Sequence, residues 1–348
     1  MKQLHVGILF GGASTEHEVS RRSATTILRS IPSKYKKTPI GITKEGKWFA
    51  YFGDESLIAN GDWEKADEKY EIFFSSNEIL YKKDGELLPL AIDVAFPVLH
   101  GKFGEDGTIQ GLFEMLNLPY VGCGVGASSN AMDKSITKLL VATAGIRQAD
   151  FVLVDRYNKQ NPEALIAESE EKLGYPVFVK PCRSGSSVGV AKAADRAALR
   201  AGLETALQYD DRILIEEGID ARELECAVLS YDNEMIAEVG EVISALEYYD
   251  YEAKYNNPTS RTETSPDISP EIEAEIREKA IRIFKLLDCR GLSRIDFFLD
   301  RKNGEVVFNE INTLPGFTNI SMYPMLIEKH GISREELVDK LIQEALHK

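Results

Sequence analysis

Two neighbouring runs of strand-forming residues near the carboxyl end of this 348-residue chain constrain its fold more than any other feature. Residues 293–300 (SRIDFFLD) and 305–312 (EVVFNEIN) are separated by a short polar segment that contains Asn303-Gly304, a pair that tolerates positive φ. We therefore expect an antiparallel hairpin. Its register decides its chemistry, because a shift of one residue moves every side chain to the other face of the sheet.

Two loop lengths are compatible with this turn. A two-residue Asn-Gly loop would place Asp296 opposite Ile311 and put Glu310 on the other face. A three-residue loop with Gly304 in the left-handed conformation would instead pair residue 301 with residue 305. The register therefore depends on one residue of loop length.

We predict the three-residue loop, which sets Asp296 opposite Glu310 and Arg294 opposite Asn312 on one face. Apolar residues flank these carboxylates, and buried carboxylates need a cation. Oxygen ligands with no His or Cys nearby favour a hard ion, and Mg²⁺ bridging to phosphate fits best. The alternative interpretation is a solvated acidic edge hairpin.

Composition and charge exclude several classes of protein. With 43% hydrophobic and 28% charged residues the chain is typical of globular proteins, and its length predicts two or three domains. No apolar run is long enough to cross a bilayer, and the net charge of -15 argues against a broad nucleic-acid surface. The four cysteines lie far apart without a CxxC pair, which indicates a reducing compartment.

The N-terminal part predicts an open α/β domain, in which ligands collect beyond the carboxyl ends of the strands. Three buried-type strands are expected, at residues 4–10, 37–42 and 91–99. The polar stretch 54–85 indicates irregular surface with modest helix. Thr15-x-x-Glu18 matches a capping box, so capping is the ordinary role for Glu18. His100 lies at a strand end, where a lone histidine is more often structural than substrate-binding.

The middle of the chain carries two notable lysines. After a small-residue link at 122–129, which predicts a first domain boundary, Lys134 lies near the first turn of a helix over 132–144. A lysine is electrostatically misplaced there unless an anion lies beside it, and the alternative is a surface lysine. Lys180 ends a strand that precedes the glycine- and serine-rich loop 182–189. Because this order is not that of a Walker A loop, the loop is a flap over phosphates or a flexible turn.

Later segments supply further candidates. The strand 212–217 has a polar end that can offer backbone groups to a base edge. Glu223 and Glu225 share a strand face, where one could accept from ribose hydroxyls or both could be solvated. The tyrosine-rich stretch 247–261 has no regular period and is typical of a lid. Capped helices are expected from Ser269-Pro270 and from Ser333, the last with an apolar core stripe of Leu337, Leu341, Ile342 and Ala345.

Taken together, the segments HGKFGEDGTIQG, VKPCRSGSSVGV, LIEEGIDARELECAV, YYDYEAKY, SRIDFFLD and NEINTLPGFT resemble the D-alanyl-D-alanine ligases of the ATP-grasp superfamily, in order and spacing over nearly the whole chain. The resemblance implies an α/β fold, α+β in its ATP-grasp part. A Rossmann-like N-terminal domain with an open parallel sheet (1–125) would precede a central ATP-grasp subdomain (126–215) and a C-terminal one with the metal site (216–348).

The resemblance also implies an activity: ATP-dependent ligation of two D-alanine molecules through an acyl phosphate, for peptidoglycan synthesis. The expected cofactors are ATP and two Mg²⁺ ions, for which Mn²⁺ can substitute. We expect a cytoplasmic homodimer with no nucleic-acid or membrane partner. The alternatives are a D-alanine:D-lactate or D-alanine:D-serine ligase, another ATP-grasp ligase or kinase, and a nucleotide-binding regulatory module without chemistry.

The same resemblance assigns residues to ATP and metal. The lysines Lys134 and Lys180 would contact ATP phosphates. The metal ligands would be Asp296, Glu310 and Asn312. Around the nucleotide, from flap to adenine and ribose, the implied residues are Ser186, Ser187, Glu216, Glu217, Ile219, Glu223 and Asn309.

For the substrates, the resemblance overturns the capping role and implies that Glu18 holds the first D-alanine's ammonium. Arg294 and the Gly316 N–H would stabilise the oxyanion, and Glu18, Ser186 and Tyr255 would link three segments by hydrogen bonds that close the lid. Tyr255, in place of the histidine of lactate-using relatives, implies an amine acceptor. The remaining implied substrate residues are His100, Lys254, Ser321, which would bind the second carboxylate, and Met322.

Overall fold

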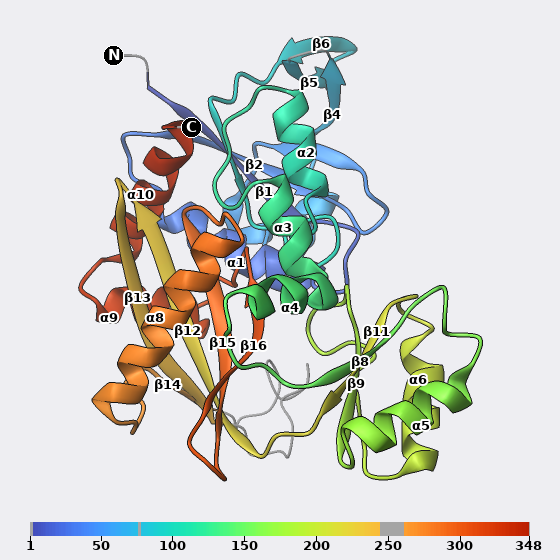
Figure 1. The fold of residues 1–348 in the computed structure, drawn as a ribbon. Helices are drawn as coiled ribbons and strands as arrows, with labels where there is room; N and C mark the ends of the chain where they lie inside the picture. Colours follow the sequence, from blue (N-terminus) through green and yellow to red (C-terminus); the bar gives the residue numbers. More distant parts are fainter. Residues whose placement is uncertain (1–2, 76–77, 244–260, 348) are drawn as a thin grey trace.

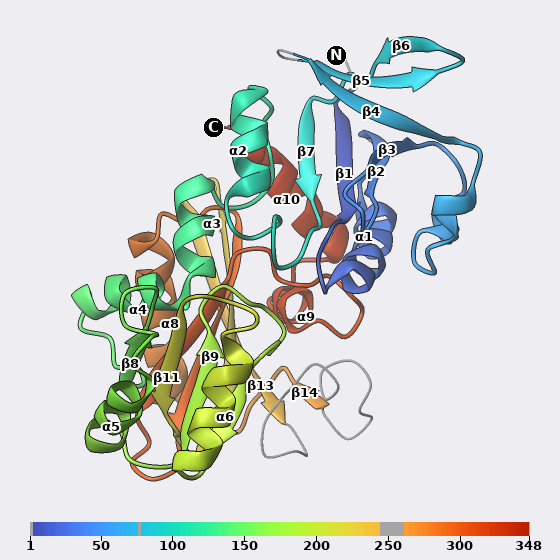
Figure 2. The same cartoon turned by 90° about the vertical axis from the view of Figure 1, so that its right-hand side faces the viewer.

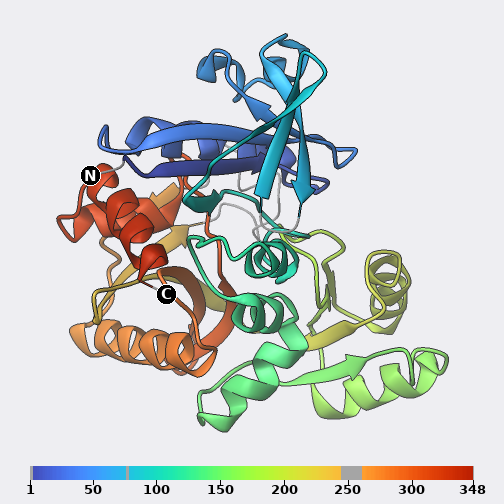
Figure 3. The same cartoon turned by 90° about the horizontal axis from the view of Figure 1, so that it is seen from above.

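The computed structural model describes residues 3–75, 78–243 and 261–347, and these form three sheets that follow one another along the chain (Figure 1). In the view turned by 90°, the N-terminal sheet lies above the other two (Figure 2). Seen from above, the C-terminal elements and the central elements occupy two different sides of the molecule (Figure 3). None of the helices in the described ranges is long and apolar enough to cross a membrane.

The first sheet has the strand order β6-β5-β4-β3-β2-β1-β7, and β1 is parallel to both β2 and β7. The other pairs are antiparallel. The three predicted strands are thus confirmed as the parallel centre, since all seven residues of β1 are buried. The elements are β1 (His5–Gly11), α1 (His17–Ser30), β2 (Lys36–Ile42), β3 (Trp48–Tyr51), η1 (Glu55–Leu57), η2 (Asp62–Lys65), β4 (Lys69–Ser75), β5 (Glu78–Lys83), β6 (Glu86–Pro89), β7 (Val94–Pro97) and α2 (Thr108–Met115).

The prediction for residues 54–85 was right about modest helix but wrong about irregular surface in the later part. Two 3-10 helices occupy its start, and β4 and β5 form an antiparallel ribbon that extends the sheet. The ribbon carries aromatic residues on both faces, and Phe73 and Phe74 remain exposed. The alternation of apolar and polar residues that marks a half-buried strand is therefore weak here, so hydrophobic periodicity did not predict these strands.

The second sheet is antiparallel, in the order β10-β9-β11-β8. Helices α5 and α6 cover its outer face, and their apolar residues form one buried cluster with the strands (Figure 1). The predicted strand with Lys180, the following loop and the strand 212–217 are confirmed. The elements are β8 (Phe151–Val154), α5 (Pro162–Lys172), β9 (Val177–Pro181), β10 (Ala191–Ala193), α6 (Arg196–Ala206) and β11 (Ile213–Glu217).

The third sheet is antiparallel, in the order β14-β13-β12-β15-β16. Helix α8 packs on one face, and α3 and α4 join the same buried cluster, although they precede the second sheet in sequence. The elements are α3 (Val125–Met132), α4 (Lys134–Thr143), β12 (Ala221–Tyr231), β13 (Glu234–Ile243), β14 (Arg261–Glu263), α8 (Pro270–Leu286), β15 (Leu292–Asp300), β16 (Val306–Asn312), α9 (Met322–Lys329) and α10 (Arg334–Leu346).

Two predictions about element boundaries bear on this packing. The link predicted at residues 122–129 is helical from Val125 onward, so the small residues there do not form an extended linker. The domain division at residues 125 and 215 stays a prediction. The capping box of Ser333 with Glu336 is confirmed, and the apolar stripe of α10 is buried against α1 and β7, so the C-terminal helix returns to the N-terminal sheet.

The β15–β16 hairpin has the predicted pairing at its functional end. Asp296 lies opposite Glu310 and Arg294 opposite Asn312. The predicted three-residue loop was wrong, because Asp300 pairs with Glu305 around a four-residue loop. This register alone would place Asp296 and Glu310 on opposite faces of the sheet. A β-bulge at Asn309 inserts one extra residue and restores the pairing.

Candidate active site

A cleft of about 1090 Å³, open mouth included, lies where the three sheets approach one another. Its walls come from nine stretches of the chain, between Glu16 and Met322. Of the residues predicted for the site, the lining includes Ser186, His100, Lys134, Arg294, Glu310, Asn312, Gly316, Ser321 and Met322. The cleft is therefore built from the same segments that carry the predicted chemistry.

Glu18 does not lie in this cleft, so its predicted contact with Ser186 is wrong. Helix α1 begins at His17, and Glu18 forms an exposed ion pair with Lys44 at 2.5 Å. The predicted capping box is absent as well, since no side chain caps this helix. Glu16, two residues earlier, is 8% exposed and accepts a hydrogen bond of 2.5 Å from the Ser186 hydroxyl. Glu16 is thus the carboxylate that meets the flap.

Two glycines make room for the Glu16 carboxylate. A Cβ on Gly101 would lie 2.5 Å from Glu16 Oε2, and a Cβ on Gly185 would lie 2.8 Å from the same atom. The neighbouring serines of the flap, Ser186 and Ser187, have positive φ values of 49° and 56°. This conformation is uncommon outside glycine, and it turns the flap toward the cleft. The loop therefore lies at the cleft, where a flap is expected, and its role over phosphates stays a prediction.

Lys134 lies at the N-terminus of α4 with its side chain only 17% exposed, so the surface alternative is wrong. Its Nζ lies 3.2 Å from Glu310 Oε2 and donates to the Ser184 carbonyl at 3.0 Å. Burial works against its charge, but the Glu310 carboxylate outweighs this and raises the pKa of Lys134. The anion that the helix end required is therefore supplied by β16.

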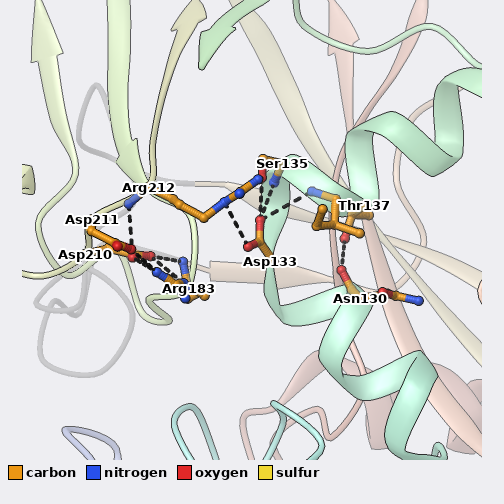
Figure 4. Close-up of polar contacts among 9 residues, drawn as sticks. Asn130, Asp133, Ser135, Thr137, Arg183, Asp210, Asp211 and Arg212 are labelled. Carbon is orange, nitrogen blue, oxygen red and sulfur yellow. Dashed lines mark hydrogen bonds and ion pairs between the residues drawn. The ribbon is translucent and has the colours of Figure 1, made fainter. Parts of the chain in front are cut away.

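Asp133 provides a second anion at this helix end, and Figure 4 shows the network around it. Its carboxylate caps α4 by accepting from the Ser135 and Ile136 backbone N–H groups. Arg212, at the start of β11, pairs with Asp133 at 3.2 Å and donates to the Ser135 hydroxyl, while Arg183 pairs with Asp210 and Asp211. These contacts join the second sheet to the helix that carries Lys134.

Lys180 and Glu216 do not line the cleft. Glu216 Oε2 accepts from Lys180 at 2.6 Å, and its Oε1 lies 3.0 Å from Lys138, a buried lysine that sequence reasoning missed. Burial would raise the pKa of Glu216, but Lys138 and Lys180 lower it to about 2. Lys180 also donates to the bulge residue Asn309 at 3.3 Å. The bulge therefore aims Asn309 at the predicted phosphate-binding lysine.

The predicted metal ligands form one polar group with Arg294. The guanidinium donates to both oxygens of Asp296, at 2.8 and 2.7 Å, and pairs with Glu225 at 3.1 Å. Asn312 donates to Asp296 Oδ2 at 3.1 Å. Burial opposes the charge on Arg294, but Asp296 and Glu225 raise its pKa well above the ordinary value.

Oxygen atoms alone make up the donor set of Asp296, Glu310 and Asn312, and such a set fits a hard divalent cation. Among the described residues, there is no cluster of three or more His, Cys, Asp or Glu side chains of metal-binding geometry. The predicted set of Asp296, Glu310 and Asn312 falls outside this description, because only two of its ligands are carboxylates and the third is an amide. It lacks sulfur and imidazole ligands, so zinc is disfavoured.

His100 is buried and held at both ring nitrogens, by the Leu314 carbonyl at 3.0 Å and the Ser23 hydroxyl at 3.1 Å. Its burial lowers its pKa, which favours the neutral ring. Glu105, which sequence reasoning missed, accepts from the Gly101 and Leu314 backbone N–H groups. Burial and the nearby Glu16 carboxylate raise the pKa of Glu105 to about 8. The motif HGKFGEDG contained this signal, because Glu105 follows a strand end.

The segment after β16 forms the far wall of the cleft. Ser321, at the N-cap of α9, has its hydroxyl 2.8 Å from that of Thr318 and accepts from the Thr318 N–H at 3.0 Å. A Cβ on Gly316 would lie 2.9 Å from Ser321 Oγ, so only glycine allows this approach. Met322 is buried.

The residues predicted for adenine and ribose do not line the cleft, and neither do Ser187, Asn309 and Asp296. The Glu217 side chain accepts from Arg147 at 2.6 Å and from the Asp150 N–H at 2.9 Å. Glu223 lies on β12 opposite Phe298 of β15. No contact places Ile219 at a ligand site. Lys254 and Tyr255 lie outside the described residues.

Comparisons with known proteins agree with this arrangement. The family model described as D-ala D-ala ligase N-terminus matches residues 5–123, and that described as D-ala D-ala ligase C-terminus matches residues 140–343. The D-alanine--D-alanine ligase of Clostridium novyi is 49% identical over 99% of this chain and 98% of its own length. D-alanine--D-alanine ligase B of Clostridium tetani is 49% identical over 100% of this chain and 95% of its own length.

Two solved structures have the same fold along their whole length. The VanG D-Ala:D-Ser ligase from Enterococcus faecalis has a TM-score of 0.89 at 38% identity, covering 99% of this chain and 100% of its own. The D-alanine-D-alanine ligase from Coxiella burnetii has a TM-score of 0.85 at 32% identity, and the match covers 100% of this chain and 95% of that structure's chain. By sequence and by structure, this chain belongs to the D-alanine:D-alanine ligase family.

Proposed function

We propose that this chain ligates two D-alanine molecules to D-alanyl-D-alanine for peptidoglycan synthesis, with cleavage of ATP to ADP and phosphate. The observation that carries the proposal is the convergence of Glu16, Lys134 and the hairpin residues Arg294 and Glu310, from three distant segments, in one cleft. An amino acid needs an anion for its ammonium and cations for its carboxylate, and a triphosphate needs several cations. This cleft supplies both kinds of charge.

In the first step, a carboxylate oxygen of the first D-alanine attacks the γ-phosphorus of ATP, and ADP leaves. Such a transfer requires positioning and charge neutralisation more than acid–base catalysis. Lys134 and Lys180 would bind phosphate oxygens. Glu16 would hold the ammonium of this substrate, because it is the carboxylate that the flap reaches. The role assigned to Glu18 by resemblance is therefore not retained.

In the second step, the amine of the second D-alanine attacks the acyl carbon after losing its extra proton, and phosphate leaves. The tetrahedral oxyanion would accept from Arg294 and from the Gly316 N–H, with Ser321 binding the second carboxylate. The Arg294 side chain is held by Asp296 and Glu225, so its orientation is set before the substrates arrive. Preorganised donors of this kind cost no reorganisation during the reaction.

Two Mg²⁺ ions, or Mn²⁺, would be held by Asp296, Glu310 and Asn312, whose oxygen atoms suit hard cations. When bound, they would supply charge neutralisation at the phosphates. Around the nucleotide we propose Ser186, Ser187, Glu216, Glu217, Ile219, Glu223 and Asn309. At the substrates and the lid we propose His100, Lys254, Tyr255 and Met322.

The experiment that tests the function is a coupled assay of phosphate release with D-Ala, L-Ala, D-Ser or D-Lac as acceptor, followed by the mass of the product. We expect phosphate release to require D-alanine and the product to have the mass of the dipeptide. A depsipeptide or a mixed D-Ala-D-Ser product would assign another acceptor. ADP release without any ligation product would contradict the proposal.

We also propose that the chain acts in the cytoplasm as a homodimer formed through its N-terminal domain. Support for a reducing compartment comes from the four cysteines, which are all free and buried. Sedimentation would test the dimer, since a monomer at assay concentrations would contradict it. The division into domains 1–125, 126–215 and 216–348 is likewise proposed, and limited proteolysis near its two boundaries would test it.

A further inference from the structure

Lys138 is a buried cation that the proposed chemistry does not use. It lies one turn after Lys134 on α4, so the two lysines share a helix face. Its side chain is 2% exposed, and its Nζ lies 3.0 Å from Glu216 Oε1 and 3.2 Å from the Ala149 carbonyl oxygen. A lysine is rarely buried to this extent unless it is paired. Its partner is therefore where its function should be sought.

Glu216 divides its two oxygens between two lysines. Oε1 faces Lys138, and Oε2 accepts from Lys180 at 2.6 Å. The Glu216 side chain is 4% exposed, so water contributes little to its solvation. Lys180 is also held by Asn309, the bulge residue next to Glu310. The chain of contacts therefore runs from α4 through β11 and β9 to the hairpin with the predicted metal ligands.

The balance of charge indicates what Lys138 contributes. Two lysines and one carboxylate leave this group with a net charge of about +1. Without Lys138, the Glu216 carboxylate would neutralise Lys180, and the group would present no net charge to a phosphate. Buried ion pairs are seldom retained for stability alone, since apolar replacements often stabilise a fold as well. A role in keeping Lys180 cationic and oriented accounts for the buried pair.

We propose that Lys138 is a positioning residue for ATP: by sharing the charge of Glu216, it leaves Lys180 free to bind the phosphates. The inference rests on the proposed ATP site and deepens it. Lys138 itself would not touch the nucleotide, because its buried Nζ is held by Glu216 and the Ala149 carbonyl oxygen.

The test compares Lys138→Met, Lys138→Gln and Lys138→Arg with the wild-type chain. Calorimetry with MgADP gives the Kd, and steady-state kinetics give the KM for ATP and for D-alanine. We expect Lys138→Met to raise the Kd for ADP and the KM for ATP by about tenfold, a change of one charge near a phosphate, with the KM for D-alanine within about twofold. Lys138→Arg should recover most of the loss. The control is Lys159→Met, which alters an exposed lysine of the same region.

Lys138→Gln separates charge from packing. Its neutral amide can still donate to Glu216 but leaves the carboxylate to neutralise Lys180, so its Kd for ADP should rise by about tenfold, as in Lys138→Met. An unchanged Kd for ADP in either folded neutral variant would overturn the inference, and so would a Kd for Lys138→Arg as high as that of Lys138→Met. If Lys138→Met does not fold, Lys138→Gln and Lys138→Arg give the same comparison. Absence of ADP binding to the wild type would overturn the ATP site itself.

Discussion

Replacing Glu16 with glutamine removes one negative charge from the cleft and keeps the shape of the side chain. Glu16 accepts from the Ser186 hydroxyl at 2.5 Å, and an amide oxygen can still accept this bond. What glutamine cannot reproduce is the attraction for an ammonium group. The substitution therefore isolates the proposed role of Glu16 in binding the first D-alanine.

The expected magnitude follows from the burial of Glu16. A hydrogen bond between two charged groups contributes about 1.5–3 kcal/mol, which corresponds to about 10–150-fold in affinity. Glu16 is 8% exposed, so solvent screens the interaction little. We expect Glu16→Gln to raise the KM for the first D-alanine by that factor and to leave the Kd for ADP unchanged.

Glu18→Gln is the matched control, with the same chemical change two residues away. Glu18 pairs with Lys44 on the surface, and both side chains are more than one third exposed. Such a pair contributes about 0–1 kcal/mol to stability and nothing to the cleft. Phosphate-release kinetics at varied D-alanine, with thermal unfolding as a check of folding, would measure both variants. A large rise in the KM for D-alanine in Glu18→Gln, with no rise in Glu16→Gln, would refute the reasoning.

Three further predictions follow from the same geometry. The pKa of Glu105 is raised from 4.5 to about 8 by burial and by Glu16, so the folded state holds the extra proton and the free energy of unfolding should fall as pH rises across that range. In Glu105→Gln, the free energy of unfolding measured with urea should fall less over this pH range. An equal fall would contradict the raised pKa of Glu105. Gly185→Ala should weaken D-alanine binding, because its Cβ would meet the Glu16 carboxylate, whereas Gly126→Ala, with open space around it, should not; equal KM values in both would contradict the steric argument. Tyr255→Phe should raise the ratio of phosphate to dipeptide, and an unchanged ratio would defeat the lid role.

The hairpin illustrates a prediction that was right for an incorrect reason. We placed the adjustment in the loop, but it lies in the bulge at Asn309. Burial along β16 does not by itself indicate the bulge, because Val306, Val307 and Phe308 are consecutive and all buried, so both faces of the strand are covered there.

Glu16 and Glu18 illustrate a different limit. Both are carboxylates two residues apart in a loop–helix junction, and the capping pattern and the resemblance both selected Glu18. The start of α1 at His17 and the contact of Glu16 with Ser186, 170 residues away, decided otherwise. Local propensity contains no information about a partner at that distance.

The amino-acid sequence by itself determined most strands and helices around the cleft, and the family, because periodicity and ordered motifs are local properties that survive without coordinates. Only the tertiary structure showed that a bulge at Asn309 brings Asp296 and Glu310 to one face. Only the tertiary structure decided which carboxylate enters the cleft and that Lys138 is buried against Glu216. The physical reason is that a side chain's charge state and orientation depend on neighbours from other segments, and only the packed fold brings these together.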